Sequence, residues 1–207
     1  MRQIKKLSRA FYEGDDVVQI ARDLIGKILV TNVSGQRTGG RIVETEAYAG
    51  AIDRASHAYG GRRTERTEVM YGRGGTAYVY LCYGIHHLFN VVTHGRDTPH
   101  AVLIRGIEPL QGIDVMLERT GKKAGDTTLG RGPGNVSTAL GIRTSQTGLS
   151  LLGREIYIAD DGFSFAPGDI IASPRIGVDY AGQDALLPYR FSVKGHAHVS
   201  KAPGKKR

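Results

Sequence analysis

Two stretches, Arg41-Ile-Val-Glu-Thr-Glu-Ala-Tyr48 and Thr76-Ala-Tyr-Val-Tyr-Leu-Cys-Tyr-Gly84, decide how the rest of the chain is interpreted. Side chains alternate between the two faces of a strand, so Glu44, Glu46 and Tyr48 should point the same way. A carboxylate next to a stacking ring suits a site that holds a flat, ring-shaped substrate and activates a water against it. The first stretch therefore predicts a strand that carries a candidate active site.

The two glutamates by themselves fit a solvated strand face equally well. Strict alternation would place Ile42 on the same face, before the glutamates, and Tyr48 after them. A face that is only partly polar favours a cleft. A partly buried carboxylate near a basic groove can deprotonate water.

The second stretch and the apolar run that follows it at 85–93 predict a β-hairpin with Tyr83 at its tip. A large ring at a hairpin tip has little to pack on within its own domain. Such a ring can act as a wedge that enters a base stack. Tyr78 and Tyr80 share a strand face, and ordinary sheet packing explains Tyr78.

The composition indicates one soluble domain with an anionic partner. The chain has 207 residues, 40% of them hydrophobic, and a net charge of +8. Nucleic acid, an anionic membrane surface and an acidic small molecule all fit this charge. No apolar stretch approaches the roughly 20 residues that span a bilayer, and the basic start of the chain lacks the apolar segment of a signal peptide. We therefore expect a cytoplasmic protein with no membrane partner.

The hydrophobic patterning predicts an α+β fold, a single mixed domain (1–200) around a curved antiparallel-rich β-sheet with a protruding β-hairpin and flanking helices. A basic tail, 201–207, should be disordered. Helices are predicted over 8–26, 110–119 and 137–141, and mostly loop over 50–75 and 121–135. The predicted strands cover 27–33, 41–49, 76–82, 85–93, 100–107, 155–159, 170–172 and 189–193.

Neither a metal nor another cofactor is expected. Adjacent histidines such as His86 and His87 point to opposite faces of a strand, and Cys82 is the only cysteine. Gly130-Arg-Gly-Pro-Gly-Asn135 resembles a phosphate-binding loop but lacks the lysine and the hydroxyl residue of a P-loop. Contact between its backbone amides and a DNA phosphate remains open.

In combination, the motifs resemble those of the alkyladenine (3-methyladenine) DNA glycosylases, over residues 8 to 200. The motifs that carry the resemblance are the first stretch, His57, Gly60-Gly-Arg62, Tyr78-Val-Tyr80, Tyr83-Gly84, Asn90-Val-Val92, Val102-Leu-Ile-Arg105, Gly132-Pro133 and Arg175-Ile-Gly-Val-Asp-Tyr-Ala-Gly182. The chain departs from the family at Arg73-Gly-Gly75, where members usually carry a proline. Two glycines there should loosen the approach to the Tyr83 hairpin.

The resemblance implies a role for each site residue. Glu46 would be the general base that activates the attacking water, and Arg105 would hold that water and a neighbouring phosphate. Asn90 would screen the base edge, and Tyr83 would fill the gap left in the duplex. Three further side chains would enclose the extruded base: Tyr48, His57 and Tyr80.

The resemblance implies a monofunctional glycosylase that flips alkylated or deaminated purines out of double-stranded DNA and hydrolyses the N-glycosidic bond. The bases would be 3-methyladenine, 7-methylguanine and hypoxanthine. No lysine belongs to the motif set, which argues against a lyase step. The enzyme should act as a monomer, and four arginines of the 50–75 segment should contact the DNA backbone: Arg62, Arg63, Arg66 and Arg73.

Two other functions fit parts of the sequence. A non-catalytic RNA- or ribosome-binding module would explain the charge and the tyrosines, but Glu44 and Glu46 would repel phosphates in the middle of its binding face. A hydrolase of free nucleosides would share the carboxylate and the rings, but it needs neither a basic surface nor an exposed ring at a hairpin tip.

Overall fold

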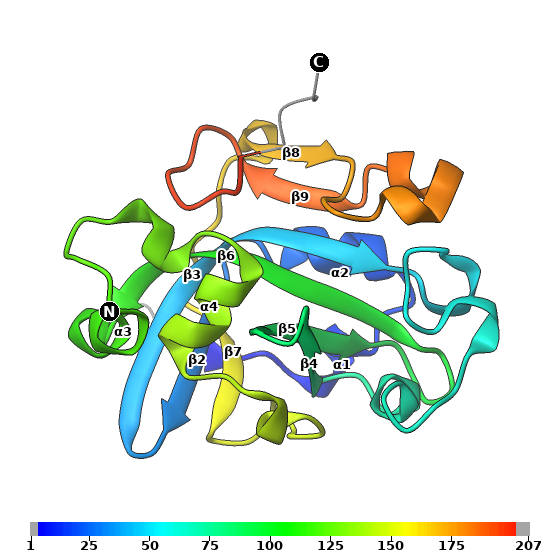
Figure 1. Cartoon of the computed structure of the whole chain (residues 1–207), viewed down its shortest axis with the longest axis horizontal. Coiled ribbons are helices and arrows are strands. Elements are labelled where there is room, and N and C mark those ends of the chain that lie inside the picture. Colours follow the sequence, from blue (N-terminus) through cyan, green and yellow to red (C-terminus); the bar gives the residue numbers. More distant parts are fainter. Residues whose placement is uncertain (1–3, 202–207) are drawn as a thin grey trace.

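The computed structural model describes residues 4–201 and has one α+β domain around a nine-stranded antiparallel sheet (Figure 1). The strands are β1 Lys5–Lys6, β2 Ile28–Val33, β3 Gln36–Tyr48, β4 Thr76–Cys82, β5 His86–Thr93, β6 His100–Gln111, β7 Ile156–Asp160, β8 Ile170–Ser173 and β9 Arg190–Val193. Seven strands follow the order β1-β7-β2-β3-β6-β5-β4, while β9 pairs with both β3 and β8. The predicted fold class is confirmed. Of the predicted tail, only Lys201 lies within the described residues.

The long strand β3 organises the sheet. It pairs with β2 over its first half, with β6 along most of its length, and with β9 at Glu44–Glu46. The Ser34-Gly35 turn has positive φ at both residues, 53° and 74°, as a tight hairpin turn requires. The strand therefore begins at Gln36, before its predicted start, because hairpin pairing extends it through a polar, glycine-containing segment.

A pair of irregularities between β3 and β6 changes the direction of side chains next to the glutamates. Ile42 pairs with Ile107 and Glu44 with Gly106, so Val43 has no opposite residue. Ile42 and Val43 both pack in the main hydrophobic core. The expectation that Ile42 shares a face with Glu44 is therefore wrong, because a β-bulge interrupts the alternation. The second irregularity, between Glu44 and Thr45, leaves Arg105 of β6 without an opposite residue on β3.

The first predicted helix is interrupted. The segment 8–26 forms two helices, α1 Arg9–Tyr12 and α2 Val17–Asp23. Asp16 starts the second helix, because its carboxylate accepts hydrogen bonds from the N–H groups of Val18 and Gln19 at 2.8 and 3.0 Å.

Two further boundaries differ from prediction. α3 is Ile113–Thr120, because β6 continues to Gln111. α4 is Pro133–Leu140 and begins inside the predicted glycine-rich loop. Pro133 stands in its first turn, where a missing N–H costs nothing. The 50–75 segment also contains three short 3₁₀ turns, Gly50–Ile52, Tyr59–Gly61 and Glu68–Tyr71.

The hairpin β4–β5 forms as predicted, with Tyr83 in the turn. Tyr83 and Gly84 have φ values of 51° and 73°, and the Ile85 N–H donates to the carbonyl of Cys82. Tyr83 is 92% exposed. This geometry is that of a type I′ turn, the turn that matches the twist of a two-stranded ribbon.

The two glycines before this hairpin do not loosen it. The N–H of Gly74 donates to His94 O, and that of Gly75 donates to Val92 O, both at 2.9 Å. A Cβ on Gly74 would lie 2.7 Å from the carbonyl oxygen of Tyr12, and one on Gly75 would lie 2.8 Å from its ring. Glycine is needed here because Tyr12 packs directly against the backbone, which corrects the expectation of a flexible approach.

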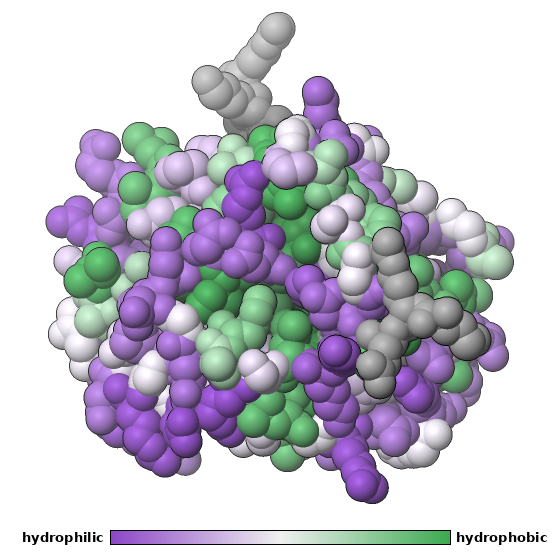
Figure 2. Space-filling view, turned by 180° about the vertical axis from the view of Figure 1, so that it is seen from behind, coloured by the Kyte–Doolittle hydropathy of each residue, from purple (hydrophilic) through white to green (hydrophobic). Residues whose placement is uncertain are grey.

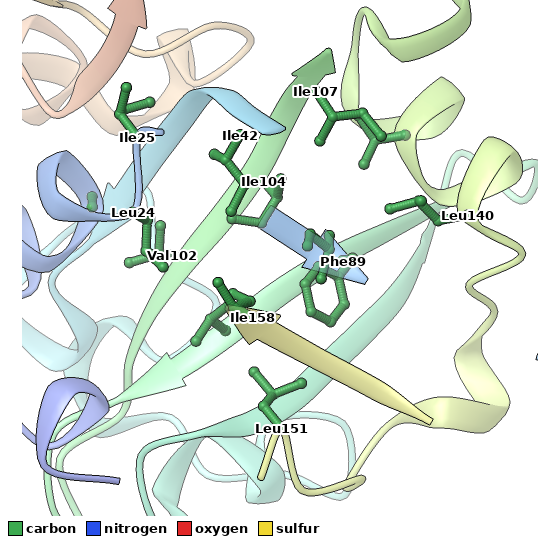
Figure 3. Close-up of a cluster of buried hydrophobic side chains, with 14 of the residues drawn as sticks. Leu24, Ile25, Ile42, Phe89, Val102, Ile104, Ile107, Leu140, Leu151 and Ile158 are labelled. Atoms are coloured by element: carbon green, nitrogen blue, oxygen red, sulfur yellow. The ribbon is translucent and has the colours of Figure 1, made fainter. Parts of the chain in front are cut away.

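The main hydrophobic core lies between the sheet and its helices (Figure 3). It includes Ile42 and Val43 of β3, Phe89 of β5, Ile104 of β6 and Leu140 of α4. On the face opposite to that of Figure 1, hydrophilic side chains dominate the outline and apolar ones gather nearer the centre (Figure 2). In residues 4–201, no helix combines the length and the apolar character required for a bilayer crossing.

Candidate active site

One row of paired residues across four strands forms the floor of the site. Tyr78 on β4 pairs with Asn90 on β5, Asn90 pairs with Leu103 on β6, and Leu103 pairs with Glu46 on β3. Directly paired residues project their side chains to the same face of a sheet. Residues from distant parts of the sequence therefore meet on one surface, as the motifs predicted.

Glu46 is fully buried and accepts three hydrogen bonds. Its Oε2 accepts from the hydroxyl of Tyr48 at 2.8 Å and from Nη1 of Arg105 at 3.3 Å. Its Oε1 accepts from the backbone N–H of Ile176 at 2.7 Å. Burial raises the pKa of Glu46, while the charge of Arg105 and the N–H of Ile176 oppose the rise.

The second glutamate holds the arginine. Glu44 is also fully buried, and its Oε1 accepts from Nε of Arg105 and from Nη1 of Arg190, both at 3.2 Å. Its Oε2 accepts from the backbone N–H of Ser200 at 2.8 Å. The predicted common direction of the two glutamates is confirmed by their shared partner, Arg105. Glu44 thus holds Arg105 through Nε, while Nη1 of the same guanidinium bonds to Glu46.

A cavity of about 420 Å³ opens over this floor. Its aromatic walls are Tyr48, Tyr78, Tyr80 and His57, and Arg105 lines it as well. Glu46 does not line the cavity, because it lies directly behind Tyr48 and Arg105. The volume is in the range of small-ligand pockets.

The aromatic groups are held in fixed positions. The His57 and Tyr80 rings meet edge to face with centroids 4.6 Å apart. Nδ1 of His57 lies 2.8 Å from the hydroxyl of Tyr78. Burial lowers the pKa of His57 to about 4, with the charges of Arg66 and Arg62 acting in the same direction. His57 is therefore neutral at pH 7 and adds no repulsion toward a cationic ligand.

Tyr78 was missed as a cavity residue. Sheet packing accounts for its 2% exposure, yet Tyr78 also lines the cavity and bonds to His57. Its place two residues before Tyr80 was the signal, since residues i and i+2 of a strand share a face.

Asn90 lines the cavity with its amide group fixed. Nδ2 donates to the carbonyl oxygens of Tyr78 and Leu88, both at 3.2 Å. Because both neighbours are acceptors, the NH₂ group faces them and Oδ1 turns away. Asn90 is thus bonded within the hairpin and also presented to the cavity.

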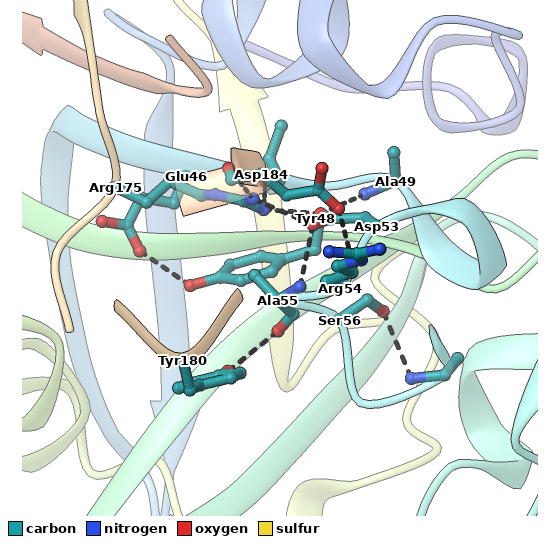
Figure 4. A network of polar contacts seen from close by, with 12 residues as sticks. Glu46, Tyr48, Ala49, Asp53, Arg54, Ala55, Ser56, Arg175, Tyr180 and Asp184 are labelled. Carbon is teal, nitrogen blue, oxygen red and sulfur yellow. Dashed lines mark hydrogen bonds and ion pairs between the residues drawn. The ribbon is translucent and has the colours of Figure 1, made fainter. Parts of the chain in front are cut away.

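A segment far along the chain completes the cavity. The segment 175–180 contacts β3 at Ala47 and Glu46. Its residues Ile176, Gly177, Val178 and Tyr180 line the cavity together with the tyrosines of β4. Arg175 forms a buried, two-bond ion pair with Asp53 (Figure 4). No local pattern in the sequence reveals that this segment reaches Glu46, because the contact spans 130 positions.

Of the four arginines predicted to contact the DNA backbone, two are bound to acidic side chains and two are not. Arg63 is bound to Glu68 and Asp97, and Arg73 to Glu13, at distances of 2.6 to 3.0 Å. By contrast, Arg62 and Arg66 are exposed, and no acidic side chain of the described region forms an ion pair with either.

Arg62 and Arg66 line a second cavity of about 400 Å³. It shares four lining residues with the first cavity: Ser56, His57, Arg66 and Tyr180. Arg66 also lies over the ring of Tyr80, 5.0 Å from its centroid. Across residues 4–201, no three histidine, cysteine or acidic side chains are grouped closely enough to hold a metal ion.

The comparisons with known proteins agree on one family. The family model described as "Methylpurine-DNA glycosylase" matches residues 10–197. A protein of Chlamydia abortus is 48% identical over 89% of this chain and 96% of its own length. A protein of Bacillus cereus is 47% identical (93% and 97%), and one of Clostridium perfringens is 43% identical (95% and 99%). All three are named "Putative 3-methyladenine DNA glycosylase".

Proposed function

The chain belongs to the methylpurine-DNA glycosylase family, and from this premise we propose that it removes alkylated and deaminated purines from double-stranded DNA. The bases in question are 3-methyladenine, 7-methylguanine and hypoxanthine. The single observation that carries the proposal is the aromatic cavity backed by a buried carboxylate and its arginine. A base within a duplex cannot reach such a cavity, so the damaged nucleotide must be flipped out of the stack.

The cavity walls suit a cationic base. Alkylation of a purine ring nitrogen gives the base a positive charge, and a cation held against an aromatic face gains about 0.5 to 2 kcal/mol. The rings of Tyr48, Tyr80 and neutral His57 would enclose the flipped base. The charge also makes the base a good leaving group, so hydrolysis needs one activated water and no strong acid.

Glu46 is the proposed general base. The water would enter through the base cavity and approach Glu46 between Tyr48 and Arg105, which separate the carboxylate from the cavity. Glu46 would take a proton from this water while the water oxygen attacks the sugar carbon and the N-glycosidic bond breaks. Arg105 would hold the water and a neighbouring phosphate, and Glu44 supports this placement because it anchors the guanidinium.

The duplex would be held by the hairpin tip and the unpaired arginines. Tyr83 is the proposed wedge, since its ring stands 92% exposed at the rim of the base cavity. Arg62 and Arg66 are the stronger candidates for phosphate contacts, while Arg63 and Arg73 would first have to leave their acidic partners. Asn90, held rigidly by the hairpin, would screen the edge of the base.

The reaction would end at the abasic site. Within the described residues, the cavity lining contains no lysine, so no amine stands ready to form a Schiff base with the sugar. The enzyme is proposed to act as a monomer.

The test is incubation of the protein with duplex oligonucleotides that each carry one of the three lesions or none, followed by alkali cleavage. We expect strand cleavage only after alkali and only in lesion-containing duplexes. Cleavage without alkali would establish a lyase step. Release of base from free nucleosides, with duplex DNA left intact, would replace the proposal with nucleoside hydrolysis.

A further inference from the structure

A buried ion pair connects the turn after β3 to the segment that closes the cavity. Nη1 and Nη2 of Arg175 bond to the two carboxylate oxygens of Asp53, at 2.5 and 2.9 Å, and the side chains are 0% and 1% exposed. The Asp53 carboxylate also accepts from the N–H groups of Ala49 and Ala55, both at 3.0 Å. The Asp53 carboxylate is therefore fixed in position, because it accepts hydrogen bonds from the backbone of the turn that follows β3.

Arg175 is also attached to β3. Nη1 donates to the carbonyl of Ala47 at 2.9 Å, and the guanidinium lies 4.9 Å from the centroid of the Tyr48 ring. One arginine thus touches the backbone before Tyr48 and the face of its ring. Figure 4 shows Arg175, Asp53, Tyr48 and Glu46 gathered at this point.

Arg175 is next to two hydrogen-bond donors of Glu46. The residue after Arg175 is Ile176, whose N–H donates to Glu46 Oε1 at 2.7 Å. The ring on which Arg175 stacks is that of Tyr48, whose hydroxyl donates to Glu46 Oε2 at 2.8 Å. We propose that the Asp53–Arg175 pair is a positioning element for Glu46, which sets the two hydrogen-bond donors that hold its carboxylate.

This inference rests on the proposed role of Glu46 as general base. A carboxylate with two fixed donors keeps one orientation, and misplacement of a reacting group by about 1 Å can cost about 10²-fold in rate. The donors also favour the ionised form of Glu46 against the effect of burial. Loss of the pair should therefore slow excision and move the ionisation of Glu46 to higher pH. The groups that act on this ionisation are Arg105, Tyr48, Glu44, Arg175, Tyr80 and Tyr180.

The experiment compares Arg175→Lys with Arg41→Lys. Arg41 makes a comparable set of contacts elsewhere on β3: two bonds to Asp161, one to the carbonyl of Gly26, and stacking on Phe163 at 4.1 Å. Arg175 has in addition a bond to the carbonyl of Asp184 at 3.0 Å and a second ring, Tyr189, at 5.3 Å. Single-turnover excision of 3-methyladenine from methylated duplex DNA is measured across pH, together with binding to a duplex that carries an abasic-site analogue. We expect Arg175→Lys to lose about 10- to 100-fold in rate, with its acidic limb moved to higher pH and its DNA binding retained. Arg41→Lys should keep the wild-type pH profile.

A wild-type pH profile in a folded Arg175→Lys variant would overturn the inference, as would an equal change in Arg41→Lys. Should Arg175→Lys fail to fold, Asp53→Asn supplies the same test, because it keeps the shape of the side chain and removes the charge. The amide proton of Ile176 is a second readout, since its NMR shift should titrate with Glu46 in the wild type and lose this response in the variant. Full excision by Glu46→Gln would refute the general-base role on which this inference rests, and absence of excision by the wild type would refute the proposed function. Both results are distinct from an unshifted pH profile.

Discussion

Nη1 of Arg105 lies 3.3 Å from Oε2 of Glu46, and both side chains are withdrawn from solvent. The contact exists because a β-bulge leaves Arg105 without an opposite residue on β3 while Glu44 binds its Nε. A buried carboxylate without a cation would take up a proton, so Arg105 keeps Glu46 available as a base. Arg105 is thus the buried counter-ion that keeps Glu46 ionised and able to act as a base.

Glu46→Gln should retain DNA binding and lose base excision, because an amide cannot accept the proton of the water. Loss of a general base costs about 10² to 10⁴ in rate. Single-turnover excision from a lesion-containing duplex is the measurement, and Glu118→Gln on the exposed face of α3 is the matched control. Near-normal excision by Glu46→Gln would remove Glu46 from the role and turn attention to Glu44.

Binding to undamaged duplex should weaken steeply with salt, and Arg62 should contribute more to this slope than Arg63. Each phosphate contact adds about 0.9 to the log–log slope. Arg62→Ala should therefore lower the slope by about 0.9, while Arg63→Ala should change it less, because Glu68 and Asp97 already neutralise Arg63. Titrations at several salt concentrations give the slopes. A flat response for the wild type would point to a small-molecule substrate.

Tyr83→Ala should impair extrusion of the damaged nucleotide and leave the cavity intact, since the ring stands clear of the core. The loss should be smaller for a mispaired lesion, because such a base is easier to unstack. Tyr83→Phe, which keeps the ring, should restore most of the rate. The measurement is the excision rate from duplexes in which the lesion is paired or mispaired. An equal loss of rate in both duplexes would mean that Tyr83 is only a packing residue.

Asn90→Ser should raise the excision of 7-methylguanine relative to 3-methyladenine. Guanine carries an amino group where adenine carries hydrogen, and Asn90 cannot swing aside because two carbonyls hold its amide. The steric cost is about 1 to 3 kcal/mol, which the smaller serine would relieve. The readout is the ratio of the two released bases, with Asn32→Ser at an exposed position of β2 as control. An unchanged ratio in a folded variant would mean that Asn90 serves the sheet alone.

Gly75→Ala should destabilise the protein more than Gly121→Ala. Both glycines have positive φ, 80° and 66°, and the backbone strain on alanine is about 1 to 3 kcal/mol at each. Only Gly75 adds a clash, since its Cβ would lie 2.8 Å from the ring of Tyr12, whereas nothing lies within 4 Å at Gly121. Denaturant unfolding measures the difference. Equal losses of unfolding free energy in the two variants would show that the Tyr12 ring can move aside at little cost.

The α+β class, the hairpin with Tyr83 and the shared direction of Glu44, Glu46 and Tyr48 were determined by the sequence alone. Each depends on a local rule, since strand alternation and turn chemistry act over a few neighbouring residues. The helix boundaries at Asp16 and Pro133 also had local signals, which the hydrophobic pattern obscured.

Only the tertiary structure decided what surrounds those residues. Ile176 reaches Glu46 across 130 positions, and Arg175 reaches Asp53 across 122. The split of the basic cluster, in which Arg73 is neutralised and Arg62 is not, depends likewise on Glu13, 60 positions from Arg73. No periodicity encodes such contacts, because they arise when separate segments pack together and each buried charge must find a partner wherever the fold supplies one.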